Sequence, residues 1–202
     1  ACCQLRKVTD GRSVEAYRSA DRAVYCSSDQ AEAYAILPHL RPRRTRRAQD
    51  MTPSHLTQIA DARHREGFNC AQATLSAFTE ELGLPLDVAM RLAAPFGGGM
   101  GRRGEVCGAA SGALMALGLR YGSSVADKAA KEAMYAITAE FLRRFEARTG
   151  ALHCRDLIQA DMTTPEGLAW ARARNVFTTI CPGIIDAAVE IADDLMQRSE
   201  KS

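Results

Sequence analysis

Four cysteines that lie far apart in the sequence, Cys70, Cys107, Cys154 and Cys181, are each at or beside a residue that we predict to begin a helix. A thiol at a helix N-terminus lies next to unpaired backbone N–H groups and the positive end of the helix dipole, and both lower its pKa. The thiolate is the form of cysteine that binds metals and attacks disulfides. The four positions therefore predict one shared site for metal or redox chemistry.

A glycine-rich loop at residues 97–104 precedes the helix that carries the second of these cysteines. Its backbone can turn sharply or approach another group closely, and its N–H groups can reach sulfur atoms. The next helix, expected at about 105–119, has small residues at 107–112, so we expect a neighbouring helix or a bulky cofactor to lie close to it. The glycines expected to bind a cofactor are Gly97, Gly98, Gly99, Gly101 and Gly108.

The same four thiols allow three kinds of chemistry. Four thiolates are the usual ligands of a [2Fe-2S] or [4Fe-4S] cluster. Structural zinc uses the same donors, but its sites usually contain Cys-x-x-Cys pairs, and the sequence has none. A metal-free dithiol, formed by Cys107 and one other cysteine, is the third alternative. The spacing Gly99-x-Gly101-x-x-Gly104 matches the dinucleotide-binding fingerprint, but that motif follows a β-strand and no strand is predicted here. We therefore do not expect dinucleotide binding.

From Met51 onward, the spacing of apolar residues predicts helices as the elements that position these residues. No stretch has the alternating β-branched residues typical of a strand. We predict an all-α fold, a compact multi-helix bundle. Thr52, Asn69, Ser124 and Thr164 are expected to cap helices, while Gly67, Gly83 and Gly150 follow helix ends. The predicted helices cover about 53–66, 70–82, 85–94, 105–119, 125–149, a short stretch after 153, 165–177 and 182–195.

The chain has 202 residues and two regions of different charge. Residues 1–50 contain ten Lys and Arg against six Asp and Glu and show weak periodicity, so we expect a poorly ordered basic extension. The region with clear helical periodicity begins at Met51, and a methionine is where a protein chain can start. Residues 1–50 are therefore open to a second interpretation, as an upstream extension that is not native sequence. Residues 51–202 form the predicted four-cysteine helical domain. A solvated basic segment is commoner than one that binds nucleic acid, so we expect no nucleic-acid partner.

The compartment follows from what the sequence lacks. No apolar run reaches the roughly 20 residues of a membrane span, and the first residues lack the apolar stretch of a signal peptide. We therefore expect a cytoplasmic protein without membrane insertion. Seven cysteines in a reducing compartment point to metal or redox chemistry rather than to structural disulfides.

Four segments with these cysteines resemble the C-GCAxxG-C-C family of redox-active proteins. They are 68–73 (Phe-Asn-Cys-Ala-Gln-Ala), the glycine loop with 105–112 (Glu-Val-Cys-Gly-Ala-Ala-Ser-Gly), 154–157 (Cys-Arg-Asp-Leu) and 181–183 (Cys-Pro-Gly). The similarity spans nearly all of residues 54–195 and leaves residues 1–50 outside.

This resemblance implies a small helical domain with a redox role. Related domains in split-Soret cytochromes combine an iron–sulfur cluster with haem, but this chain has no Cys-x-x-Cys-His for covalent haem attachment. The cluster would be held by Cys70, Cys107, Cys154 and Cys181, with a [2Fe-2S] centre favoured and zinc as the alternative. Such a protein transfers electrons or senses redox state, and we expect a redox protein as its partner; a homodimer is left open.

Overall fold

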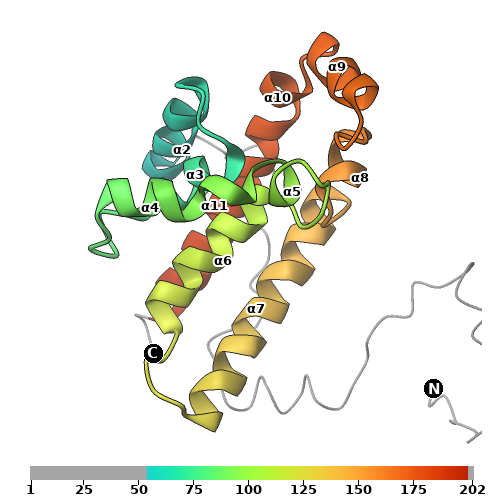
Figure 1. Cartoon of the computed structure of the whole chain (residues 1–202). Helices are drawn as coiled ribbons and strands as arrows, with labels where there is room; N and C mark the ends of the chain where they lie inside the picture. Colours follow the sequence, from blue (N-terminus) through green and yellow to red (C-terminus); the bar gives the residue numbers. More distant parts are fainter. Residues whose placement is uncertain (1–53, 200–202) are drawn as a thin grey trace, which may run out of the picture.

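The computed structural model describes residues 54–199, and within them the protein is all-α, as the sequence predicts (Figure 1). The N-terminal extension expected at 1–50 lies outside the described residues. The elements are α2 (His55–Arg65), α3 (Cys70–Ser76), α4 (Leu86–Ala93), η3 (Ala94–Phe96), α5 (Gly97–Met100), α6 (Gly108–Tyr121), α7 (Lys128–Thr149), α8 (Cys154–Ile158), α9 (Pro165–Ala173), α10 (Val176–Thr179) and α11 (Cys181–Ser199).

Helices α6, α7 and α11 form the long part of the molecule, and α3 crosses one end of α6 (Figure 1). The close contact of α3 with α6 needs the small residues of α6. A Cβ atom at Gly112 would lie 2.5 Å from the carbonyl oxygen of Ala71 and 3.0 Å from the Cβ of Thr74. A neighbouring helix, one of the two alternatives raised by the sequence, therefore accounts for the glycine at this position.

Two apolar clusters form the interior. The larger joins α2, α3, α6, α7 and α11 and contains the stacked rings of Phe141 and Phe145, whose centroids are 5.9 Å apart. The smaller is built from α8, α9, α10 and the segment before α9. Cys107 belongs to the first cluster and Cys154 to the second, so the cysteines lie where the two clusters meet.

Several predicted helix ends are confirmed. Asn69 caps α3 in a capping box, in which its side chain accepts from the backbone N–H of Gln72 and the Gln72 side chain accepts from the Asn69 N–H. Thr164 caps α9 through the N–H of Gly167, and α7 ends at Gly150, whose φ of 91° is left-handed. These ends depend on contacts within one turn, which the sequence shows directly.

Other predicted ends are wrong. The first helix is capped by Ser54 rather than Thr52, which lies outside the described residues, and the long helix α7 is capped by Asp127 rather than Ser124. In both cases the predicted cap lies a few residues before another residue of a capping type.

The remaining corrections concern helix length. The regular helix α3 stops at Ser76, after which the chain continues in turns to Gly83. The predicted helix 165–177 is two helices, α9 and α10, because Asn175 adopts a left-handed φ of 54° between them. Helix α6 begins at Gly108 and not at 105, because Val106 pairs with His153 in an isolated antiparallel bridge.

No single described helix has both the length and the apolar composition needed to cross a membrane. Helix α9 together with the α10–α11 segment meets that test only as a pair bent by 51°.

Candidate functional site

The four sequence-predicted cysteines are held by the starts of four helices. Cys70 and Cys154 are the first residues of α3 and α8, Cys107 is the N-cap of α6, and Cys181 is the first residue of α11. All four are free thiols. Cys107 and Cys154 are buried, with 4% and 5% of their surface exposed, whereas Cys70 and Cys181 are partly exposed.

A short extended contact brings Cys107 and Cys154 together. The N–H of Cys107 donates to the carbonyl of Leu152 at 2.9 Å, and the N–H of Cys154 donates to the carbonyl of Glu105 at 2.7 Å. This pairing uses the N–H groups of both cysteines for backbone bonds. It therefore fixes the two thiols in place and leaves neither N–H free for a sulfur atom.

Cys70 is the centre of the site. The Cys107 thiol donates a hydrogen bond to the Cys70 sulfur, which also accepts from the backbone N–H groups of Gly98, Ala71 and Cys70 itself. The bond from Cys107 is the largest cause that lowers the pKa of Cys70 from its ordinary 9.0 to about 6, and burial opposes it. This low pKa favours the thiolate form of Cys70.

The pKa values of the other three thiols are raised rather than lowered. The bond to Cys70, burial and the negative charge of Cys70 hold the pKa of Cys107 well above its ordinary value. Burial first, and then the same charge, raise the pKa of Cys154 and of Cys181 to about 12. The expectation that all four helix starts lower a thiol pKa is wrong, because the bond to Cys70 raises the pKa at Cys107 and burial raises it at Cys154 and Cys181. The negative charge of Cys70 thus contributes to the pKa of each of the other three thiols.

The predicted glycines differ in how they serve this site. A Cβ at Gly108 would lie 2.5 Å from the Cys70 sulfur, and one at Gly99 would lie 2.8 Å from the Cys154 Cβ, so both allow close approach. The absence of a Cβ at Gly97 lets the Asn69 side chain approach the loop closely. The backbone N–H of Gly98 donates a hydrogen bond to the Cys70 sulfur. Gly101 touches no cysteine; its φ of 62° is the reason for glycine there.

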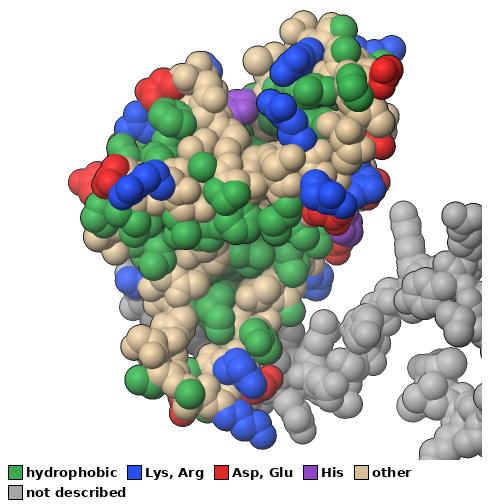
Figure 2. All heavy atoms as spheres, in the orientation of Figure 1, with side chains coloured by type: hydrophobic (Ala, Val, Ile, Leu, Met, Phe, Trp, Pro, Cys, Tyr) green, Lys and Arg blue, Asp and Glu red, His purple; other side chains and the backbone are tan. Residues whose placement is uncertain are grey.

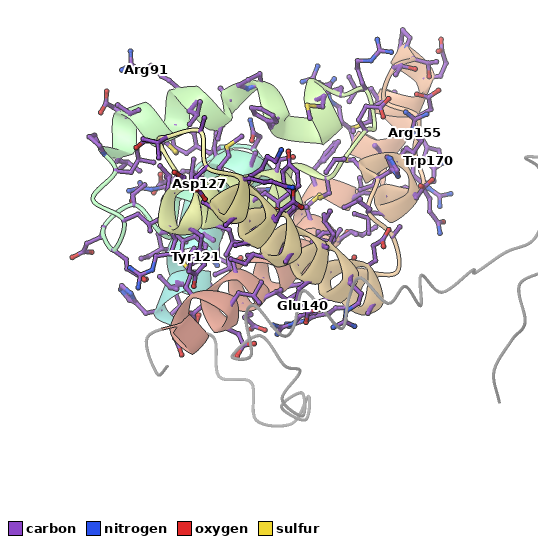
Figure 3. The ribbon with its side chains drawn as sticks, turned by 90° about the horizontal axis from the view of Figure 1, so that it is seen from below. Arg91, Tyr121, Asp127, Glu140, Arg155 and Trp170 are labelled. Atoms are coloured by element: carbon purple, nitrogen blue, oxygen red, sulfur yellow. The ribbon has the colours of Figure 1, made fainter. Side chains whose placement is uncertain are left out.

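Arg155 is a residue of the site that the sequence reasoning did not find. Its guanidinium donates to the carbonyls of Gly104 and Arg103 at 3.1 and 2.9 Å and pairs with the carboxylate of Glu105 at 3.0 Å. It thereby ties the end of the glycine loop to α8, next to Cys154. Figure 3 shows Arg155 at one end of the molecule, far from Arg91 of α4. Its position directly after a predicted site cysteine was the only signal in the sequence.

The donor atoms suit a thiolate-bound metal group, since four free thiols gather in one region. The placement of the side chains is less favourable for metal binding than their chemistry. In the part of the chain that the structure describes, no three His, Cys, Asp or Glu side chains are placed to hold a metal ion together. Among the four thiols, a hydrogen bond contributes to the pKa only between Cys70 and Cys107. Whether the four cysteines and the glycines bind a cofactor stays a prediction.

Comparison with known proteins identifies a family for this chain. The family model described as "Putative redox-active protein (C_GCAxxG_C_C)" matches residues 68–195, a span that contains all four cysteines and the glycine loop. No curated protein and no solved structure matches the chain.

Proposed function

The chain belongs to the C_GCAxxG_C_C family, and on that premise we propose that its redox couple is the dithiol of Cys70 and Cys107, which cycles with a disulfide. The observation that carries this proposal is that the two cysteines lie side by side: a Cβ at Gly108, the residue after Cys107, would lie 2.5 Å from the Cys70 sulfur, and the Cys107 thiol is the largest cause that lowers the pKa of Cys70. A thiolate next to a protonated thiol is the arrangement that thiol–disulfide exchange needs.

The exchange proceeds in two steps. The Cys70 thiolate attacks one sulfur of a disulfide substrate, forms a mixed disulfide and releases the other sulfur as a thiolate. Cys107 then gives its proton to that thiolate and attacks the Cys70 sulfur, which releases the second substrate sulfur. The protein is left with a Cys70–Cys107 disulfide and the substrate has gained two electrons.

The structure supports this order of events. The pKa of Cys107 is raised by its bond to Cys70 and by the charge of Cys70. Both causes disappear when Cys70 enters a mixed disulfide, because its sulfur then carries no charge. Cys107 therefore becomes easier to deprotonate at the moment when it must attack. A reduced redox protein would return the disulfide to the dithiol.

The test is to map the disulfide formed on mild oxidation of the reduced protein. We expect mass spectrometry of the digested protein to find a peptide pair linked through Cys70 and Cys107. The link should persist in Cys154→Ser and Cys181→Ser variants. A linkage between other cysteines, or four thiols that remain free, contradicts the proposal.

An iron–sulfur cluster on Cys70, Cys107, Cys154 and Cys181, [2Fe-2S] rather than [4Fe-4S], is the second candidate. One observation favours it: the charge of Cys70 acts on all three other thiols, so the four lie within reach of a shared group. When bound, such a cluster supplies one-electron transfer. Protein purified without oxygen should then show visible absorption with matching iron and sulfide, and Cys154→Ser or Cys181→Ser should abolish both. Intact iron loading in either variant contradicts the cluster.

A further inference from the structure

A surface pocket of about 460 Å³ lies between the end of the glycine loop and the start of α9. Its lining includes two arginines from the loop, two threonines from the segment before α9 and two apolar side chains, together with Gly101 and Pro165. These arginines, threonines and apolar side chains are Arg102, Arg103, Thr163, Thr164, Met162 and Leu168. The pocket combines positive charge with an apolar surface.

The charged side chains that line this pocket are both arginines. Arg102 and Arg103 form no ion pair with a described residue, and no carboxylate lines the pocket. The carboxylate of Glu105 is paired with Arg155 at 3.0 Å. The carboxylate of Asp161 accepts from the backbone N–H and the hydroxyl of Thr163, so one negative charge lies at the threonine side of the pocket. In the space-filling view, basic side chains on this side of the molecule lie among acidic ones (Figure 2). The pocket therefore suits an anionic ligand.

The same pocket is a direct neighbour of the thiol site. A Cβ at Gly98 would lie 3.2 Å from the Cγ of Arg102 and 3.3 Å from the Cε of Met162, and the N–H of Gly98 donates to the Cys70 sulfur. One residue of backbone thus separates the pocket from Cys70. Met162 and Leu168 also belong to the apolar cluster that contains Cys154 and includes Cys181 at its edge.

We propose that this pocket binds the carboxylate end of a small disulfide substrate, with Arg102 and Arg103 pairing with the anion and Met162 and Leu168 contacting the carbon chain. The inference rests on the proposed exchange at Cys70 and Cys107, and it assigns the class of substrate. Met162 is an unbranched, flexible side chain between pocket and thiol, and it is the group that must move for a sulfur atom to reach Cys70.

The kinetic test compares two disulfides of similar length on the full reduced chain. One is 3,3′-dithiodipropionate, which has a carboxylate at each end, and the other is the neutral 2-hydroxyethyl disulfide. We expect the anionic disulfide to react faster, and the Arg102→Gln/Arg103→Gln variant to lower the ratio of the two rate constants by roughly twofold to thirtyfold, the range for two exposed ion pairs. Arg91→Gln, which removes an exposed arginine of α4, should leave the ratio unchanged.

A binding test separates this inference from the redox proposal. Suberate has the length and charge of dithiodipropionate but no sulfur, so it cannot react. We expect it to shift the side-chain NMR signals of Arg102 and Arg103, and to bind more weakly to the Arg102→Gln/Arg103→Gln variant. Equal binding to both proteins, or equal reactivity of the two disulfides, overturns the pocket assignment. If neither disulfide reacts while suberate binds as expected, the exchange chemistry fails and the anion pocket stands.

Discussion

Removing the Cys107 thiol should raise the pKa of Cys70, because the hydrogen bond from Cys107 is the largest cause of its low value. The informative pair of variants is Cys107→Ala, which has no donor, and Cys107→Ser, whose hydroxyl can still donate. The backbone N–H groups of Gly98, Ala71 and Cys70 remain in both. We therefore expect the pKa to move from about 6 toward 9.0 in the alanine variant and much less in the serine variant.

The size of the effect on reactivity depends on pH. A full return to a pKa of 9.0 would lower the thiolate fraction at pH 7 from about nine-tenths to about one-hundredth. A more basic thiolate is also a better nucleophile, by about 20-fold over three pKa units, so the net loss at pH 7 is only about fourfold. At pH 5.5 the loss grows to about 30-fold, and above roughly pH 8 the alanine variant should react faster than the wild type.

The assay is the rate at which iodoacetamide alkylates Cys70, followed by mass spectrometry from pH 5 to pH 10. We expect the wild type and Cys107→Ser to titrate at low pH, Cys107→Ala to titrate at higher pH, and the alanine and wild-type curves to cross. A wild-type midpoint near 9, or equal midpoints for the wild type and Cys107→Ala, would refute the reasoning. Circular dichroism of each variant shows whether the fold is kept.

Three further predictions concern the fold around the site. Gly108→Ala should destabilise the protein by about 1–3 kcal/mol in urea unfolding, because its Cβ would lie 2.5 Å from the Cys70 sulfur. Gly118→Ala in the same helix meets nothing within 4 Å and should stabilise by up to about 1 kcal/mol; equal effects of the two would contradict the packing argument. Asn69→Ala removes the cap of α3 and should cost about 1 kcal/mol, with slower alkylation of Cys70, and an unchanged unfolding midpoint would count against it. Burial and the charges of Asp61 and Glu190, partly offset by Arg148, raise the pKa of Asp186 to about 6. Because the folded state binds this proton more tightly, stability should fall as the pH rises from about 4 through 6. Asp186→Asn should remove this fall and gain about 1 kcal/mol at pH 8 after solvent screening, and parallel stability curves for the variant and wild type would exclude this cause.

Features that depend on nearby residues could be predicted from the sequence. The capping box of Asn69 and Gln72, the threonine cap of α9 and the left-handed Gly150 are each set within one turn of helix. The all-α class follows from the same local periodicity. The caps of α2 and α7 were wrong by a few residues because several capping residues stand in a row.

The sequence by itself indicated most residues of the candidate site, through four cysteines at predicted helix starts, a glycine loop beside them and a resemblance to a redox family, but it did not indicate Arg155. It could not determine how the thiols differ, since a helix start lowers a thiol pKa only where burial does not outweigh it. The tertiary structure decided that Cys70 faces the Cys107 thiol and the N–H of Gly98, while Cys154 and Cys181 are raised by burial. It also placed Arg102 next to Met162, 60 residues further along the chain. Such contacts depend on the packing of distant segments, which local patterns do not specify.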